Sequence, residues 1–497
     1  MKKFAYAATI AATLSISTYA NADGVDEAAL QRLDQQLPNT LEQLYQKHQL
    51  KGDLLLAVVN KSGLRYSYTL NAQGNEAGKN GLSTDTPFLI ASHTKAFTGT
   101  LAQVLAAEGE FQLSAPIETY LADEITHPKI ASDSITVTQL LNHTAGFTSI
   151  MHTFKTAFLG YETEAQLIEA LNTNTLVAPA GVFRYSNTGP ILAARAMENA
   201  TGKSWKKLMD EKLFSPLGMH HTSSTLSAYP AGAILPSIEV GADSEVLRTG
   251  LFKTDNTLHA AGGSVSTLDD MAKWLQFNLK QSNELSTAAD FFTPLHAPTT
   301  SQEKTYYTYE RTGYSLAWDI ANYHDNTILT RFGGYAGLSF HASFMPEQGV
   351  AVIAFFNDQR GYLLPHLAAN LAYNLVIAPE LAQSRYAEEM QDVEKSIARE
   401  QANSLAPSSR VSYTTEWQDQ LGTYINTDGW PAITLAEKDN QVWLSNGVLK
   451  GPLYANEKEE GGYVVNLGSL RRPIKLSVSE AEEDTLMNGS LEYLKQD

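Results

Sequence analysis

The stretch LIASHTKAFTGT, residues 89–100, places a lysine, Lys95, three positions after a serine, Ser92, at the start of a run of helix-forming residues. The run ends near Gly109, so it predicts a helix with Ser92 at or just inside its N-terminus. Residues three apart share a helix face, so we expect Lys95 beside Ser92. A serine hydroxyl attacks a carbonyl only if a neighbouring group removes its proton. Ser92 and Lys95 are therefore a candidate nucleophile and base.

A second candidate pair lies in RYSNTGP, residues 184–190. Taken alone, this stretch is typical of a turn with a packed aromatic side chain. A tyrosine beside a charged lysine has a lowered pKa, however, and can act as a base. The G-x-S-x-G motif of many serine hydrolases is absent, so Ser92 has to be activated in another way. Tyr185 and Asn187 are candidates for that role.

A third stretch, RFGGYAG at residues 331–337, follows a predicted strand and combines a cation with glycines. Arg331 keeps its positive charge at any relevant pH and can bind a carboxylate with two hydrogen bonds. Gly333 and Gly334 have no Cβ, so their backbone can approach a ligand closely. We expect this stretch to contribute to substrate binding.

These three stretches, in this order, resemble motifs of the penicillin-recognising serine hydrolases, in particular the superfamily of class C β-lactamases, D,D-peptidases and esterases. Five further stretches are similar to landmarks of that family: LLNHTAGF (140–147), FSPLGMHHT (214–222), AGGSVSTLDDMAKW (261–274), YSLAWD (314–319) and GVAVIAFFN (349–357). The presence of Y-x-N and the absence of S-D-N favour the class C-like branch. The resemblance implies an α+β fold: a β-lactamase-like or transpeptidase-like domain with an antiparallel sheet flanked by helices, plus an all-helical subdomain.

The resemblance also implies roles for the candidate residues. Ser92 would be the nucleophile that forms an acyl-enzyme, and Lys95 and Tyr185 would share the role of base. Either a neutral Lys95 or a Tyr185 phenolate could take the proton, and the sequence leaves both open. Asn187 would orient the substrate amide and the lysine ammonium. The N–H groups of Ser92 and Gly334 would form the oxyanion hole.

One departure from the family pattern bears on the substrate. The family usually has Lys-Thr-Gly or His-x-Gly where this chain has Arg331-Phe332-Gly333. Arginine cannot relay a proton, but it can hold a positive potential near Lys95 and Tyr185, and we expect it to receive an acidic group of the substrate. Phe332 lacks the hydroxyl that would contact a substrate carboxylate. This departure argues against efficient β-lactam hydrolysis and favours a peptidase or an esterase.

The sequence thus predicts a serine hydrolase that acts on an amide or ester, with a D-amino-acid-containing peptide as the expected substrate. One alternative is a carboxylesterase or acyl transferase of the same fold. Another is a slow-acylating penicillin-binding protein with little turnover. The partner is a small-molecule or peptide substrate. We expect no cofactor and no metal, because the chain has no cysteine and no H-E-x-x-H motif.

The N-terminus and the overall charge indicate where the protein works. Residues 1–22 contain Lys2 and Lys3, an apolar run and a closing Ala-Asn-Ala, which predicts a signal peptide cleaved after Ala22 and a periplasmic or secreted protein. No later stretch is long and apolar enough to span a membrane. The formal net charge of −18 repels phosphate groups, which makes nucleic acid and anionic membrane surfaces poor candidate partners, and we expect neither.

The chain divides by composition into segments. After the signal peptide we expect a hydrolase domain at 23–380, a charged helical linker at 381–410 and a small β-rich domain at 411–497. The last has short strands separated by turn signals, which predicts an antiparallel barrel or sandwich. We expect this tail to contact the cell wall and to take no part in the chemistry. Near the N-terminus, leucines at helical spacing are interrupted by Pro38, which predicts one broken or two short helices.

Overall fold

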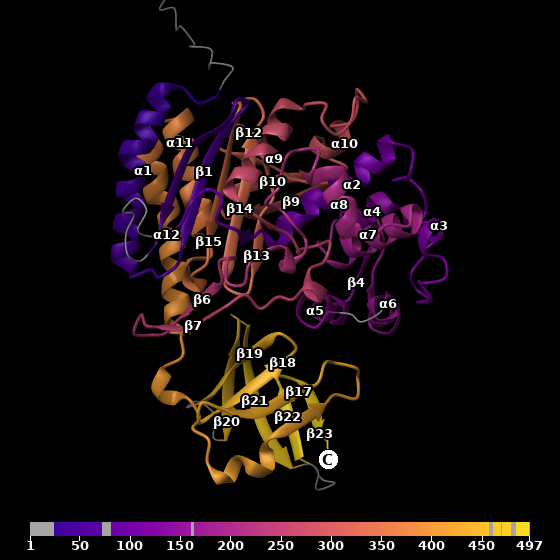
Figure 1. The fold of residues 1–497 in the computed structure, drawn as a ribbon, viewed down its shortest axis with the longest axis vertical. Coiled ribbons are helices and arrows are strands. Elements are labelled where there is room, and N and C mark those ends of the chain that lie inside the picture. The colour runs from indigo at the N-terminus through magenta and orange to yellow at the C-terminus, as the bar shows by residue number, and fades with distance from the viewer. Residues whose placement is uncertain are drawn as a thin grey trace, which may run out of the picture.

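The computed structural model describes residues 24–71, 81–160, 164–456, 461–468, 470–478 and 484–496. In these residues the chain forms an α+β unit followed by a β-barrel, which confirms the expected fold class (Figure 1). The predicted signal peptide, residues 1–22, lies outside the described residues. Within the described ranges, no helix has the length and apolar character needed to cross a bilayer.

A mixed-order antiparallel sheet forms the centre of the α+β unit. Among the described residues it has nine strands, in the order β2-β1-β15-β14-β12-β11-β10-β9, with β13 paired to β14 off this path. The strands are β1 (Leu54–Asn60), β2 (Gly63–Leu70), β9 (Thr300–Tyr306), β10 (Tyr309–Tyr314), β11 (Asp319–Tyr323), β12 (Asn326–Thr330), β13 (Gly333–Tyr335), β14 (Leu338–Met345) and β15 (Val350–Phe356). Strand β1 pairs with β15, so segments from both ends of this unit lie side by side inside the sheet.

Helices cover both faces of the sheet. One face packs against α1 (Glu27–His48), α11 (Leu364–Ile377) and α12 (Ala382–Ala402). The other face packs against α9 (Leu268–Lys280) and the helical subdomain. Strand β1 is buried along its whole length, and its alternate residues belong to the two different apolar cores. A central strand that is apolar on both faces is what two layers of helices require.

The helical subdomain lies on one side of the sheet (Figure 1). Its helices are α2 (Thr94–Ala107), α3 (Glu118–Leu121), α4 (Val137–Leu141), α5 (Ile150–Phe158), α6 (Glu164–Thr173), α7 (Thr188–Thr201) and α8 (Trp205–Met209), and α10 (Thr293–His296) lies near α2. Three short ladders pair β3 (Phe88–Leu89) with β8 (Val265–Ser266), β4 (Phe147–Thr148) with β5 (Leu176–Val177), and β6 (Ser237–Val240) with β7 (Val246–Gly250). The turn Ala91–His93, which precedes α2, contacts β13 and β14, so the N-terminus of α2 lies where the subdomain meets the sheet.

One helix differs from the expectation. Helix α1 is continuous through Pro38, whereas one broken or two short helices were predicted. Proline removes one backbone donor, but the buried leucines on either side, Leu37 and Leu41, keep the helix packed on the sheet. Helix α12 occupies most of the predicted linker 381–410 and packs on α11 through buried residues such as Val393. The boundaries of the predicted domains stay predictions.

The C-terminal segment forms a closed barrel of eight antiparallel strands among the described residues, so the barrel alternative is the correct one. The strands are β16 (Gly422–Ile425), β17 (Ile433–Lys438), β18 (Gln441–Asn446), β19 (Leu449–Ala455), β20 (Gly462–Leu467), β21 (Leu470–Val478), β22 (Asp484–Asn488) and β23 (Leu491–Lys495). The barrel contacts α5: the Val448 N–H donates to the Phe158 carbonyl over 2.9 Å, and the rings of Phe154 and Trp430 lie 6.0 Å apart.

Candidate active site

Ser92 lies in a tight turn that leads directly into α2. The turn spans Ala91–His93, and Ala91 has a φ of 45°, a left-handed conformation that is rare for a residue with a Cβ. The Thr94 hydroxyl donates to the Ala91 carbonyl over 2.8 Å, and the Ser264 N–H donates to the Thr94 hydroxyl over 3.0 Å. These contacts hold the strained turn and fix the position of the candidate nucleophile.

Lys95 joins three of the predicted elements through its ammonium group. Its side chain is buried, and Nζ donates to Ser92 Oγ over 3.1 Å, to Asn187 Oδ1 over 2.7 Å and to the Ala261 carbonyl over 2.6 Å. An ammonium has three protons, and each of them has an acceptor here. Burial lowers the pKa of Lys95 to about 8, because removal from water disfavours the charged form.

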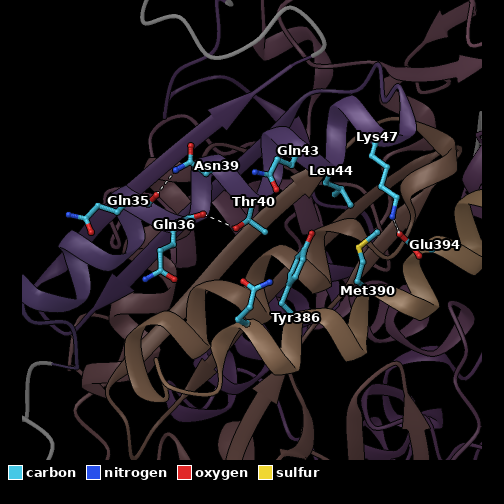
Figure 2. Close-up of a pocket in the computed structure, with 11 residues that line it drawn as sticks. Gln35, Gln36, Asn39, Thr40, Gln43, Leu44, Lys47, Tyr386, Met390 and Glu394 are labelled. Atoms are coloured by element: carbon cyan, nitrogen blue, oxygen red, sulfur yellow. Dashed lines mark hydrogen bonds and ion pairs between the residues drawn. The ribbon is translucent and has the colours of Figure 1, made fainter.

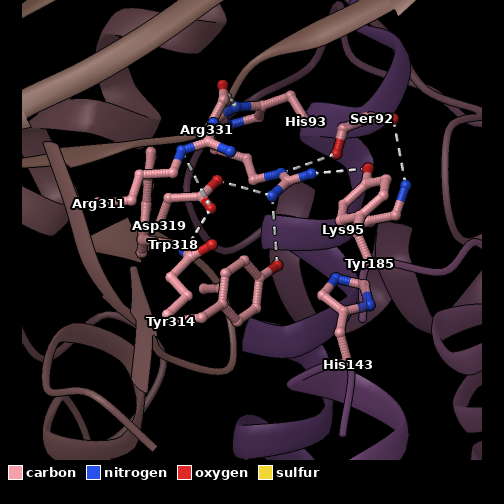
Figure 3. A network of polar contacts seen from close by, with 12 residues as sticks. Ser92, His93, Lys95, His143, Tyr185, Arg311, Tyr314, Trp318, Asp319 and Arg331 are labelled. Carbon is pink, nitrogen blue, oxygen red and sulfur yellow. Dashed lines mark hydrogen bonds and ion pairs between the residues drawn. The ribbon is translucent and has the colours of Figure 1, made fainter. Parts of the chain in front are cut away.

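Tyr185 lies beside Lys95 and the Arg331 guanidinium (Figure 3). Its hydroxyl accepts a hydrogen bond of 2.8 Å from Arg331 Nη2, and Lys95 Nζ lies 4.8 Å from the centre of its ring. Burial of the hydroxyl raises the pKa of Tyr185, but the charges of Arg331 and Lys95 outweigh it and bring the pKa down to about 8. Because 48% of the residue is exposed, water reduces both the effect of burial and the effect of the two cations on this pKa.

Arg331 is a buried residue whose three nitrogens all have partners. Nη1 donates to Asp319 Oδ2 over 2.9 Å, Nη2 to the Tyr185 hydroxyl, and Nε to the Ser92 carbonyl over 3.3 Å. The expected carboxylate contact therefore exists, but with the protein's own Asp319. A substrate carboxylate would have to displace Asp319, which is itself buried. Arg331 is thus placed to hold Tyr185 and the nucleophile turn together.

The glycines of the third stretch allow β13 to lie against the nucleophile turn. A Cβ on Gly333 would come within 2.2 Å of the Ile90 carbonyl, and a Cβ on Gly334 within 2.7 Å of the Tyr362 hydroxyl. The Ile90 carbonyl belongs to the backbone and cannot turn aside, so position 333 requires glycine. Ser92 and Gly334 line one cleft, as an oxyanion hole built from their N–H groups would require.

The cleft beside Ser92 has a volume of about 300 Å³. It lies where the sheet meets the helical subdomain, and its walls are aromatic and charged. The lining residues are Ser92, Phe183, Tyr185, Gln302, Lys304, Tyr306, Arg311, Asp319, Arg331, Phe332, Gly333, Gly334 and Tyr362. Phe332 is 7% exposed: its ring packs on that of His366, with ring centres 4.3 Å apart, and the Arg311 guanidinium lies 5.9 Å from its centre.

A second depression, of about 420 Å³, lies between α1 and α12 (Figure 2). Five of its eleven lining residues are amides, among them Gln35, Gln36 and Asn39, and an ion pair joins Lys47 to Glu394 on the surface. It contains no serine and no buried base. It therefore offers no acyl-transfer chemistry.

The sequence placed Ser92, Lys95, Tyr185, Asn187 and Arg331 in one site, and the structure brings all five together. Three participants were not assigned from the sequence: Asp319, the carbonyl of Ala261, and His143, whose ring lies 4.7 Å from that of Tyr185. Each lies inside a stretch that resembles a family landmark. Membership of such a stretch was the one feature of the sequence that could have pointed to these residues. Among the described residues, no cluster of three His, Cys, Asp or Glu side chains could hold a metal ion.

This fold and this cluster define a serine hydrolase of the β-lactamase and transpeptidase type. The family model described as Beta-lactamase matches residues 37–372, and the chain belongs to that family.

Comparison with known proteins gives distant relatives. The chain is 25% identical over 317 residues to the Unguisins hydrolase ungD' of Aspergillus campestris, covering 59% of this chain and 56% of that protein. It is 30% identical over 198 residues to the D-alanyl-D-alanine-carboxypeptidase/endopeptidase AmpH of Escherichia coli, covering 39% of this chain and 49% of that protein. The chain thus spans about half the length of these curated relatives.

Among solved structures, the fold is similar to that of the octameric penicillin-binding protein homologue from Pyrococcus abyssi. The TM-score is 0.57 at 17% sequence identity, and the alignment covers 92% of this chain and 99% of the other. Because it covers more of the chain than the family model does, the likeness extends into the C-terminal barrel. At this identity it concerns the fold alone.

Proposed function

We propose that the protein hydrolyses an amide or ester through an acyl-enzyme on Ser92, and that its substrate is a peptide containing a D-amino acid. The observation that carries this proposal is the 3.1 Å contact between Lys95 Nζ and Ser92 Oγ, made by a buried lysine whose pKa is lowered to about 8. A structural lysine has no need of a serine partner on a half-buried turn. A base with a pKa near neutrality beside a hydroxyl is what nucleophilic catalysis needs.

The site residues divide the work of acylation. Ser92 Oγ forms a bond to the carbonyl carbon as its proton passes to the base, and the N–H groups of Ser92 and Gly334 receive the negative charge on the carbonyl oxygen. The proton then moves to the leaving nitrogen or oxygen as its bond to carbon breaks. In deacylation a water molecule takes the place of Ser92 as nucleophile, and the same base receives its proton.

Two assignments of the base remain. In the contacts described above, Lys95 donates to Ser92, which suits a charged ammonium and a Tyr185 phenolate as the base. If Lys95 is neutral, its free electron pair can take the Ser92 proton directly. Both pKa values lie near 8, so either form is accessible close to neutral pH.

The substrate class draws support from one relative. AmpH is named a D-alanyl-D-alanine-carboxypeptidase/endopeptidase, and its similarity to this chain favours a peptide with D-residues over a simple ester. Arg331-Phe332-Gly333, in place of Lys-Thr-Gly, argues against efficient β-lactam turnover. Export to the periplasm or medium rests on residues 1–22 alone and stays a prediction.

The test is intact-mass spectrometry of the protein after exposure to an activated phosphonate and, separately, to a penicillin, with Ser92→Ala as the control. We expect a covalent adduct with the phosphonate on the parent protein and none on the variant. The lifetime of a penicillin adduct then separates a hydrolase, which loses it, from a slow-turnover binder, which keeps it. Absence of any phosphonate adduct on the parent protein overturns the proposal.

A further inference from the structure

The cleft beside Ser92 has a positive lining in an acidic protein. The chain carries a formal charge of −18, yet three cations, Lys304, Arg311 and Arg331, line the cleft against one carboxylate, Asp319. Arg331 and Asp319 neutralise each other across 2.9 Å. The net positive charge of the cleft therefore comes from Lys304 and Arg311. Neither residue takes part in the acylation steps proposed above.

Arg311 lies on the opposite side of Asp319 from Arg331 (Figure 3). Its Nε is 3.5 Å from Asp319 Oδ1, but that oxygen already accepts a hydrogen bond of 2.9 Å from Gln302. The buried Nε of Arg311 has no hydrogen-bond partner among the described residues. The guanidinium lies over the ring of Tyr306, 4.8 Å from its centre, so the aromatic wall fixes its plane. Arg311 is held in place but keeps donors to offer.

Lys304 lies directly across the sheet from Arg311. The two residues are register partners in the antiparallel pair β9–β10, so their side chains leave the sheet on the same face. Like charges in directly opposed positions destabilise a sheet. Among the described residues, Lys304 forms no ion pair, and Arg311 shares the carboxylate of Asp319 with Arg331. A bound anion between Lys304 and Arg311 would remove this repulsion.

We propose that Lys304 and Arg311 form a subsite for a carboxylate of the substrate, the role that the sequence assigned to Arg331. This inference rests on the proposed function, because it names which peptides the site accepts. Arg311 supplies a planar fork that can bind both oxygens, and Lys304, exposed at the rim, supplies a point charge that draws the anion in. The carboxylate is either the C-terminus of the peptide or an acidic side chain next to the cleaved bond.

Labelling rates with three activated phosphonates test the subsite. The probes share one peptide-like core and carry no carboxylate, a terminal carboxylate, or an acidic side chain. Intact-mass spectrometry follows labelling of Ser92 in the parent protein and in Arg311→Gln, Arg311→Lys, Lys304→Gln and Lys395→Gln. Lys395 is an exposed cation on α12, so its variant is the control for loss of one positive charge.

The informative quantity is the rate for an anionic probe divided by the rate for the neutral probe. We expect this ratio to fall about 10- to 100-fold in Arg311→Gln and a few-fold in Lys304→Gln, with partial recovery in Arg311→Lys. Lys395→Gln should keep the parent ratio. The anionic probe that shows the larger fall identifies the source of the carboxylate.

Two results overturn the subsite. An unchanged ratio in both Arg311→Gln and Lys304→Gln would show that neither residue recognises the anion. An equal loss with all three probes would mean that Arg311 only supports Asp319. Failure of the proposed function is a separate result: the neutral probe would then fail to label Ser92 in the parent protein.

Discussion

Arg331 donates a hydrogen bond of 2.8 Å to the hydroxyl of Tyr185 and forms an ion pair of 2.9 Å with Asp319. The arginine thereby connects a buried carboxylate on the sheet to the candidate base on the helical subdomain. Its charge contributes to the lowered pKa of both Tyr185 and Lys95. The relationship makes Arg331 a positioning residue whose loss should be visible in a pH profile.

Replacement of Arg331 by glutamine should shift the pH dependence of catalysis upward. In the parent protein, kcat/KM should rise with pH through a pKa near 8, because the Lys95–Tyr185 pair must lose a proton before it can accept one from Ser92. Removal of the Arg331 charge raises both pKa values, so the rising limb moves to higher pH. The measurement is kcat/KM from pH 6 to 10 on an activated ester.

Arg331→Lys provides the matched control, since it keeps the charge but loses the planar fork. The rising limb of its pH profile should lie closer to that of the parent protein than the limb of Arg331→Gln does. A limb at the same pH in all three proteins would mean that Arg331 acts only through packing.

Gly333→Val should separate β13 from the nucleophile turn. The new Cβ would lie 2.2 Å from the Ile90 carbonyl, a backbone atom that cannot move without moving Ala91 and Ser92. We expect the rate of phosphonate labelling to fall by more than about 10²-fold, comparable to the loss of an oxyanion-hole donor. Gly262→Ala is the control in the same region, because its Cβ would have 3.4 Å to the nearest atom. Equal labelling rates for both variants would contradict this placement of β13.

Local sequence patterns account for the centre of the sheet. Strands β1, β14 and β15 are apolar runs that are buried along their whole length, and β2 pairs with β1 in a hairpin. Helix α1 was mispredicted because tertiary packing of its leucines outweighs the local cost of Pro38. In the barrel, β19 has the sequence LKGPLYA. Glycine and proline are rare inside strands, so the hydrophobic pattern alone does not predict a strand here.

The candidate site was predictable only where residues lie in recognisable stretches. Ser92 and Lys95 are adjacent on one helical turn, so spacing alone pairs them. Asp319 was not assigned because its role depends on β11 pairing with β12, whose chain continues into Arg331, a long-range relationship that spacing cannot show. Arg311 was missed for the same reason, since its partner Lys304 is set by strand register.

The contact between the barrel and α5 should be sensitive to one glycine. Gly447 has a φ of 60°, and a Cβ there would lie 2.4 Å from the Phe158 carbonyl. Gly447→Ala should lower the free energy of unfolding by about 2–4 kcal/mol, which combines left-handed strain and overpacking. Gly489→Ala is the matched control: its φ is 62° and its Cβ would meet no atom within 4 Å, so only the strain remains.

The same pair of variants tests the expectation that the barrel takes no part in the chemistry. No described residue from the barrel lines the cleft beside Ser92. Gly447→Ala should therefore keep the parent rate of phosphonate labelling at a temperature where it is folded. A loss of labelling in Gly447→Ala but not in Gly489→Ala would show that barrel docking supports the site.

Glu389 is a buried acid outside the site, and it should make stability depend on pH. It accepts hydrogen bonds from Tyr323 over 2.7 Å and from Asn370 over 2.8 Å. Burial raises the pKa of Glu389 from 4.5 to about 7, although these two hydrogen bonds oppose the shift. A carboxyl group whose pKa is raised by folding contributes stability that is fully present below pH 4.5. That contribution is lost as pH rises through about 7.

Glu389→Gln removes this titration, so the parent protein should lose about 2 kcal/mol of unfolding free energy relative to the variant between pH 5.5 and pH 8. Urea unfolding of both proteins at the two pH values measures the difference. Glu380→Gln, at an exposed position just before α12, should keep the parent dependence on pH. A parent–variant difference that does not change with pH would show that Glu389 is already ionised in the folded protein at pH 5.5. The stabilisation of its charge by Tyr323 and Asn370 would then outweigh burial.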